Sequence, residues 1–158
     1  MKDSQYIKDI FDWLQTGGIK NENTGSQKNL GLDILKEEYE ELVSGLIKED
    51  KEEILDGAVD LVWVLCNNLL FNEISYEEFM EYFHKVSMSN WSKYCTTQEV
   101  AEETVKAYME GTHPNKMGQK IDCYWECVKG IYVIKRMDGK ILKSLYFTDV
   151  KDIENDNN

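Results

Sequence analysis

Residues 35–42 read LKEEYEEL, and residues 53–65 read EILDGAVDLVWVL. Apolar residues recur at helical spacing before and through the first segment, and the second segment is apolar over most of its length. Chain reversal is expected near residues 47–50, roughly midway between the two segments. We therefore predict two helices that fold back on each other as an antiparallel hairpin.

Both segments carry acidic residues at helical spacing. In the first, Glu38 and Glu41 share a helix face, as do Glu37 and Glu41, while Glu53 and Asp56 stand one turn apart in the second. Antiparallel folding sets these two acidic clusters opposite each other, and such repulsion requires a cation. Because ligation by carboxylate oxygens alone suits a hard ion, the spacing predicts a site for Mg2+, with Mn2+ as a substitute.

The acidic pattern also has a purely structural interpretation. A solvated helix face together with the usual enrichment of acids in a first helical turn would explain Glu52 and Glu53. Asp56 and Asp60 are different, because they lie in or beside the most apolar segment, where an unpaired carboxylate costs several kcal/mol or becomes protonated. A metal ion is one source of compensation for these two carboxylates, and Lys93 is another.

The remaining pattern predicts further helices. Apolar spacing over residues 6–14 indicates a short helix ended by Gly17-Gly18, and the polar stretch 20–29 reads as a loop that could move over a substrate. A stripe of apolar residues then predicts a bundle helix that ends near residue 48. Asp50 is expected to cap the next helix, whose part from 58 to 71 should be buried on every side and is too short to cross a bilayer.

Ser75 and Glu78 form a capping box that begins a fourth helix, which leads to Asn90 and Lys93. A fifth helix is expected from Thr97 to about residue 110. Beyond it, two apolar stretches flanking Asp138-Gly139 predict a β-hairpin over residues 131–148. The fold expected is an all-α bundle of four or more helices with a small C-terminal β-hairpin.

Length and charge limit the possible organisation and partners. A chain of 158 residues suits one domain, which we place over residues 1–150 with a disordered tail over 151–158. A net charge of −12 repels a phosphate polymer, so binding to nucleic acid is not expected. A small anionic nucleotide is compatible with this charge, because Mg2+ bound to the acids would attract its phosphates.

The four cysteines show no framework spacing, and no apolar N-terminal segment follows a basic stretch as in a secretion signal. We therefore expect the protein in the reducing cytoplasm, or in the host cytoplasm if it is phage-encoded, without a membrane partner.

The order EExxE, ExxD and the later SMSNWSK block over residues 87–93 resembles the MazG-like all-α nucleoside triphosphate pyrophosphohydrolases. The likeness is greatest to their small, often phage-borne branch that is similar to phosphoribosyl-ATP pyrophosphohydrolase. A weaker block over residues 138–143 resembles the DGKxxK tail hairpin of that branch. Residues 95–130 depart from the family pattern and read as an insertion.

The resemblance implies a fold of the all-α NTP pyrophosphohydrolase type and hydrolysis of a nucleoside triphosphate, here a deoxynucleotide, to the monophosphate and pyrophosphate. Mg2+ would be held by the acids of the two clusters, with Glu37 or Glu41 as the general base. The substrate-binding residues implied are Asp60, Asn90 and Lys93, with Lys93 on the phosphates. A homodimer or homotetramer is expected, which also follows from the apolar helix that one hairpin cannot cover.

Two alternative functions belong to other classes. The strong negative charge is compatible with an acidic mimic of DNA, although a mimic needs carboxylates spread along a surface rather than grouped at two positions. The other alternative is a helical oligomer without catalytic activity. Pyrophosphate release from nucleotides with and without Mg2+ separates both from the enzyme.

Overall fold

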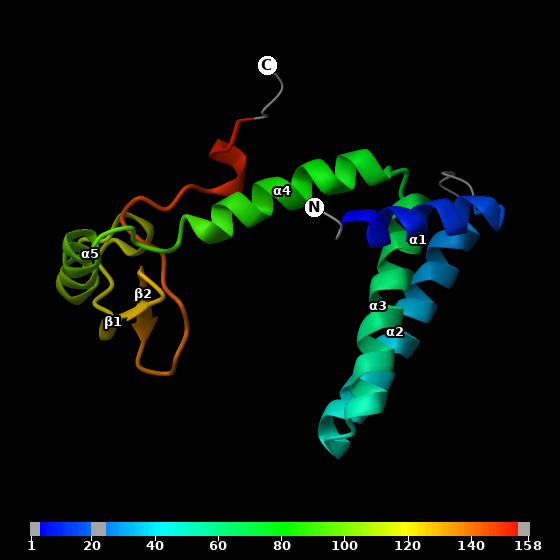
Figure 1. Cartoon of the computed structure of the whole chain (residues 1–158), viewed down its shortest axis with the longest axis horizontal. Coiled ribbons are helices and arrows are strands. Elements are labelled where there is room, and N and C mark those ends of the chain that lie inside the picture. The colour runs from blue at the N-terminus through cyan, green and yellow to red at the C-terminus, as the bar shows by residue number, and fades with distance from the viewer. Residues whose placement is uncertain (1–3, 20–24, 155–158) are drawn as a thin grey trace. The chain divides into compact units, whose positions relative to one another are not determined.

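The structure is a computed structural model that describes residues 4–19 and 25–154. These residues form five α-helices and a two-stranded antiparallel hairpin, which confirms the fold class (Figure 1). The elements are α1 Ser4–Thr16, α2 Gly25–Lys48, α3 Lys51–Phe71, α4 Tyr76–Trp91, α5 Gln98–Glu110, the 3-10 turn η1 Pro114–Lys116, β1 Cys123–Val128, β2 Ile131–Arg136 and the 3-10 turn η2 Val150–Asp152. The chain divides into two units after Glu81, inside α4, and the expected single domain over residues 1–150 stays a prediction.

The first unit contains the predicted hairpin of α2 and α3, which run side by side in Figure 1. Reversal occurs at Glu49, whose φ of 57° ends α2 in the left-handed region. Asp50 then caps α3, and its carboxylate accepts hydrogen bonds from the backbone N–H groups of Glu52 and Glu53 at 3.0 and 3.2 Å. The turn and the cap are therefore where the sequence predicted them.

Three glycines bring α2 and α3 into close contact. A Cβ added to Gly45 would lie 2.9 Å from the backbone nitrogen of Ile54, and one added to Gly57 would lie 3.0 Å from Cα of Leu42. At the other end of the hairpin, the Asn68 amide donates a hydrogen bond of 2.9 Å to the Gly31 carbonyl. The facing pairs are Gly45 with Ile54, Leu42 with Gly57, and Gly31 with Asn68. The two residue numbers have the same sum in every pair, so a single antiparallel register runs along the whole hairpin.

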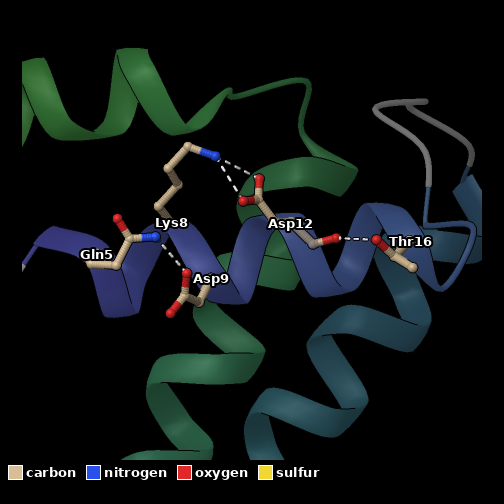
Figure 2. Close-up of polar contacts among 5 residues, drawn as sticks. All are labelled: Gln5, Lys8, Asp9, Asp12 and Thr16. Atoms are coloured by element: carbon tan, nitrogen blue, oxygen red, sulfur yellow. Dashed lines mark hydrogen bonds and ion pairs between the residues drawn. The ribbon is translucent and has the colours of Figure 1, made fainter.

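Helix α1 crosses the end of this hairpin where α2 begins and α3 ends (Figure 1). Its apolar face carries Ile10, Phe11 and Leu14, which pack with Cys66 and Leu70 of α3 in one buried cluster. The polar face is held by bonds along the helix, which Figure 2 shows. The Gln5 amide donates to Asp9, the Lys8 ammonium donates to Asp12, and the Thr16 hydroxyl donates to the backbone carbonyl of Asp12.

Helix α3 is not covered on every side within one chain, and its burial in an assembly of chains stays a prediction. Val64, Cys66 and Leu70 are buried, but Leu55 is 56% exposed and Val59 is 55% exposed. With 21 residues, the helix is also long and apolar enough to cross a membrane by length and composition, a test that core helices of soluble proteins pass as well. Length therefore does not separate the two possibilities, whereas the acids within α3 favour packing against protein.

The second unit is built on α5 and the hairpin of β1 and β2. Thr97 caps α5 and Gly111 ends it with a φ of 77°, as the sequence predicted. Buried side chains from α5 and the two strands form one core, which includes Ala101, Tyr108 and Ile134. This core holds the loops that follow α5 and β2 in place.

The predicted hairpin lies at a different position from the observed one. Strand β2 pairs with β1, which precedes it, and the two residues between them are Lys129 and Gly130. The chain does reverse at Asp138-Gly139, but the following stretch forms only a single bridge between Ile141 and Lys135. The range 131–148 is therefore wrong as a hairpin, because the first strand lies within the stretch expected as an insertion.

Two further expectations concern the ends of elements. The capping box of α4 is confirmed, since the Glu78 carboxylate accepts from the Ser75 N–H at 2.8 Å and the Ser75 hydroxyl accepts from the Glu78 N–H. The polar loop expected over residues 20–29 is wrong from residue 25 onward, where α2 has begun, and residues 20–24 lie outside the described residues. In the expected disordered tail, η2 reaches Asp152, and residues 155–158 lie outside the described residues.

Candidate metal and nucleotide site

A hollow of about 530 Å³ runs along one face of α2 and reaches the start of α3. It brings together three of the predicted site residues, Glu37, Glu41 and Glu53. The other lining residues are Asp33, Lys36, Glu40 and Ser44. The antiparallel register therefore places carboxylates from both predicted clusters on one surface.

Glu38 occupies the neighbouring face and is half-buried. Desolvation raises the pKa of its carboxyl group, and the negative charges around it raise that pKa further. These charges belong to Asp60, Glu41, Glu37 and Asp56, in decreasing order of effect. Acids of both helices thus act on Glu38, as the predicted hairpin requires.

Glu53 is held by a cation from the opposite arm. Its carboxylate oxygens lie 2.9 and 3.1 Å from the ammonium nitrogen of Lys48, the last residue of α2. This ion pair spans the turn and orients Glu53 beside the hollow. In the described part of the chain, Lys36 is the other cation near these acids, at 3.7 Å from Glu40.

Among the described residues, no three His, Cys, Asp or Glu side chains converge as a ready set of metal ligands. The donor chemistry nevertheless fits a hard cation, because the nearby groups are carboxylates, and desolvation together with their negative charges raises the pKa of Glu38. Like charges on mobile, exposed side chains move apart, and a divalent ion would draw them together. The residues suited to hold Mg2+ are therefore those of the two predicted clusters.

The three predicted substrate-binding residues fall in different places. Asp60 is half-buried on α3 and acts on Glu38. Asn90 and Lys93 belong to the second unit, where the Lys93 ammonium donates a hydrogen bond of 2.6 Å to the Asn90 side-chain oxygen. Asn90 lies in the last turn of α4, whereas Lys93 lies just beyond the end of that helix at Trp91.

Sequence reasoning missed several residues of this surface. Asp33, Glu40 and Ser44 share the hollow with Glu37 because steps of three and four keep them on one helix face. That periodicity could have identified them, but only the acids matching the EExxE spacing were singled out. The role of Lys48 depends on the turn geometry, which the spacing did not indicate.

Comparison with known families agrees with this geometry. The family model described as phosphoribosyl-ATP pyrophosphohydrolase matches residues 19–87, which include both acidic clusters of α2 and α3. Residues 19–87 belong to this family. The phosphoribosyl-ATP pyrophosphohydrolase family lies within the MazG-like superfamily of all-α NTP pyrophosphohydrolases, so the predicted family is confirmed. No curated protein and no solved structure matches the chain.

Membership of the phosphoribosyl-ATP pyrophosphohydrolase family implies pyrophosphohydrolase activity on a nucleoside triphosphate, a reaction at a phosphoanhydride. Members of the family generally use Mg2+. The matched segment ends at residue 87, before Asn90 and Lys93 and before the whole β-hairpin. The family therefore accounts for the acidic hairpin, whereas most of the second unit lies beyond the match.

Proposed function

We propose that the protein hydrolyses a deoxynucleoside triphosphate to the monophosphate and pyrophosphate, in nucleotide-pool control, with Mg2+ held by Glu37, Glu38, Glu41, Glu53 and Asp56. The observation that carries this proposal is the hollow that Glu37 and Glu41 of α2 share with Glu53 of α3, within the segment that matches the family. A divalent cation would relieve the repulsion among the carboxylates of the two helices, and hydrolysis of a phosphoanhydride by this family generally uses such a cation. When bound, Mg2+ would neutralise negative charge on the phosphates and make a water molecule easier to deprotonate.

The chain supplies the proton acceptor. Glu37 and Glu41 face the same hollow, and whichever carboxylate is not engaged by metal takes the proton of the attacking water. As the water oxygen bonds to phosphorus, one P–O bond of the α–β anhydride breaks and pyrophosphate leaves. Lys48 keeps Glu53 oriented at the edge of the hollow throughout.

Phosphate binding is assigned to Lys93, with Asp60 and Asn90 as the other substrate contacts. The bond of 2.6 Å from Lys93 to Asn90 supports this assignment, because a neutral amide fixes the ammonium group without cancelling its charge. An ammonium that keeps its charge stabilises the negative charge on phosphate oxygens in the transition state.

We further propose at least a homodimer in which a second copy covers the apolar faces of α2 and α3. Tyr39 of α2 is 58% exposed, and the exposed Leu55 and Val59 lie on α3. Adjoining apolar faces of this kind are typical of interfaces between chains. Size exclusion with light scattering tests the assembly, and a monomer at micromolar concentration would contradict it.

All four cysteines are free thiols in the structure. Burial raises the pKa of the thiols of Cys66, Cys95 and Cys123, which keeps them protonated and unreactive. Free, protonated thiols support our proposal that the enzyme acts in the cytoplasm.

The proposed reaction is tested by measuring pyrophosphate and monophosphate release from a panel of standard and modified nucleotides, with Mg2+ and with a chelator. Glu41→Gln and Asp56→Asn should abolish turnover with little loss of helicity, whereas Glu52→Gln, at the first turn of α3, should keep the normal rate. Release that does not need Mg2+, or normal rates in either site variant, would overturn the assignment. Absence of release from every nucleotide would favour an acidic interaction protein instead.

A further inference from the structure

The charge of the chain is divided unevenly between its two units. Residues 1–81 contain seven Lys and Arg against nineteen Asp and Glu, whereas residues 82–158 contain eleven of each. The whole net charge of −12 therefore comes from the first unit. Within the neutral second unit, basic side chains are gathered at one place.

That place is a pocket of about 900 Å³ in the second unit, a size typical of small-molecule sites. Its walls come from Lys93 just after α4, the loop that follows α5, and the turn that follows β2. Six basic residues line it: Lys93, Lys116, Lys120, Arg136, Lys140 and Lys143. Only two acidic residues line it, Asp122 and Asp138.

The acids do not neutralise this cluster. Asp138 is engaged by Arg136, whose Nε donates to it at 2.9 Å, so these two charges cancel each other. The ammonium of Lys143 lies 3.7 Å from the ring centroid of Phe147. In the described part of the chain, Lys116, Lys120 and Lys140 form no ion pair, which leaves Asp122 as the only carboxylate left to oppose them and Lys93.

Backbone hydrogen bonds fix the walls of the pocket. Ser144 N–H donates to the carbonyl of Lys93 at 3.1 Å, and Arg136 N–H donates to the carbonyl of Lys140 at 2.9 Å. The hydroxyl of Tyr108 donates to the Lys143 carbonyl at 3.1 Å, which ties α5 to the same loop. The basic side chains therefore project from a frame that is already formed.

Gly111 turns the chain from α5 into the third wall of the pocket. Its φ of 77° is one that glycine adopts readily and other residues rarely do. The N–H of Gly118 donates to the Gly111 carbonyl at 2.7 Å, and the N–H of Ile121 donates to the Tyr108 carbonyl at 3.0 Å. These bonds hold Lys116 and Lys120 beside the end of α5.

We propose that this pocket binds a small molecule with two or more linked phosphates, without a metal ion. Ammonium groups on three walls repel one another, and one singly charged anion is too small to satisfy them all. Linked phosphates carry several charges along a chain and accept charge-assisted hydrogen bonds from each wall. A nucleic acid fits less well, because the basic side chains line one pocket rather than a stripe along the surface and the unit as a whole is neutral.

The bound phosphates have two possible sources, a nucleoside polyphosphate or free pyrophosphate. Exposed apolar side chains of Met137 and Ile141 also line the pocket and would contact a nucleoside. A nucleotide that binds more tightly than pyrophosphate would show that these contacts are used. Equal affinities would identify the free phosphate chain as the ligand.

The experiment is calorimetric titration of the full-length protein in EDTA with pyrophosphate and with a triphosphate analogue whose α–β bridge cannot be hydrolysed. We expect binding to weaken in high salt. Lys120→Gln with Lys140→Gln should weaken it by about tenfold or more, since each lysine contributes a bond to a charged group. The matched control, Lys106→Gln with Lys151→Gln, removes two exposed lysines of the same unit that do not line the pocket and should stay within about twofold.

Absence of pyrophosphate binding by the wild-type protein would overturn the proposal, as would equal weakening in both double variants. A single-stranded oligonucleotide that binds more tightly than pyrophosphate would also overturn it. If the site double variant does not fold, Lys116→Gln provides the same comparison with one charge removed. The titration contains no divalent metal and needs no turnover, so its failure would leave the proposed hydrolysis untouched.

Discussion

The ammonium of Lys48 lies 2.9 Å and 3.1 Å from the two carboxylate oxygens of Glu53, joining the last residue of α2 to the first turn of α3. The pair stands at the turn, beside the hollow lined by Glu37 and Glu41. A cation in this position both orients Glu53 and competes for its oxygens. Removing the Lys48 charge therefore shows whether Lys48 mainly orients Glu53 or mainly competes with a metal ion for the Glu53 oxygens.

Lys48→Met should destabilise the fold by less than about 1 kcal/mol, because exposed ion pairs contribute little. If Glu53 binds metal, the same change should raise the apparent affinity for Mg2+ by up to about fivefold, since the competing charge is gone. The measurement is the Mg2+ dependence of turnover, together with calorimetric titration. Lys51→Met, which removes a charge just beyond the turn, is the control, and unchanged or weaker Mg2+ binding in Lys48→Met would exclude competition for Glu53.

The raised pKa of Glu38 predicts a pH dependence of stability. Because the folded-state pKa is above the unfolded value of about 4.3, protonated Glu38 favours the folded state. This contribution is complete below the unfolded pKa and is lost as pH rises through the folded pKa. Urea unfolding across that window should show a steeper loss of stability in the wild-type protein than in Glu38→Gln.

Millimolar Mg2+ at neutral pH should stabilise the folded state as protonation of Glu38 does at low pH, because the ion neutralises the acids around Glu38 in the folded state only. We expect the wild-type melting temperature to rise with Mg2+ and the rise to be smaller in Glu38→Gln. Glu52→Gln, at the exposed first turn of α3, should keep the full effect. A melting temperature that Mg2+ leaves unchanged would count against the metal site.

The arrangement of α2 and α3 could be predicted because several independent signals coincide. The acidic spacing predicted the reversal near residues 47–50, where α2 ends at Lys48 and α3 begins at Lys51, and Asp50 is a strong cap. The close approach at Gly45 and Gly57 was not predicted, because a glycine within a helical pattern does not show which neighbour lies against it. Only the register of the folded hairpin reveals that neighbour.

The β-hairpin was misplaced because Asp138-Gly139 is the stronger turn signal in the sequence. The structure uses Lys129 and Gly130 for the hairpin, with φ values of 51° and 81°. Lysine is uncommon at a position with positive φ, so local preference did not indicate this turn. At Asp138 the side chain pairs with Arg136 instead, and little strand follows.

The start of α2 was missed for a related reason. Gly, Ser and Asn near residues 25–29 favour a loop by local preference, yet the helix begins at Gly25. Contacts of Gly31 with Asn68 hold this end of α2 against α3. Packing with a segment distant in the sequence therefore overrides the local signal.

Gly45 provides a test of the close helix contact. In Gly45→Ala the new Cβ would lie 2.9 Å from the Ile54 nitrogen and 3.0 Å from the Glu53 carbonyl carbon, which are backbone atoms that cannot rotate away. We expect a loss of about 1 to 3 kcal/mol in the free energy of unfolding, and weaker Mg2+ binding as α3 moves away. Gly25→Ala meets nothing within 4 Å and should change stability by less than about 1 kcal/mol. Equal effects of the two substitutions in chemical unfolding would contradict the register.

Lys93 separates a structural role from a functional one. It follows α4 by two residues, where a cation stabilises the helix end by at most about 1 kcal/mol and has no effect on catalysis. If Lys93 binds the phosphates, Lys93→Met should lower kcat/KM by about ten- to a hundredfold, or about 1.4 to 2.7 kcal/mol of transition-state stabilisation, with little change in melting temperature.

The Asn90 side chain makes the comparison sharper, because it holds the Lys93 ammonium at 2.6 Å. Asn90→Ala should leave the charge in place but free its position, and should therefore give a smaller loss of kcat/KM than Lys93→Met. Lys106→Met, an exposed lysine on α5, should have normal kinetics. Normal kinetics in Lys93→Met with a lowered melting temperature would show that Lys93 only stabilises the end of α4. The residues after α4 would then not belong to the substrate site.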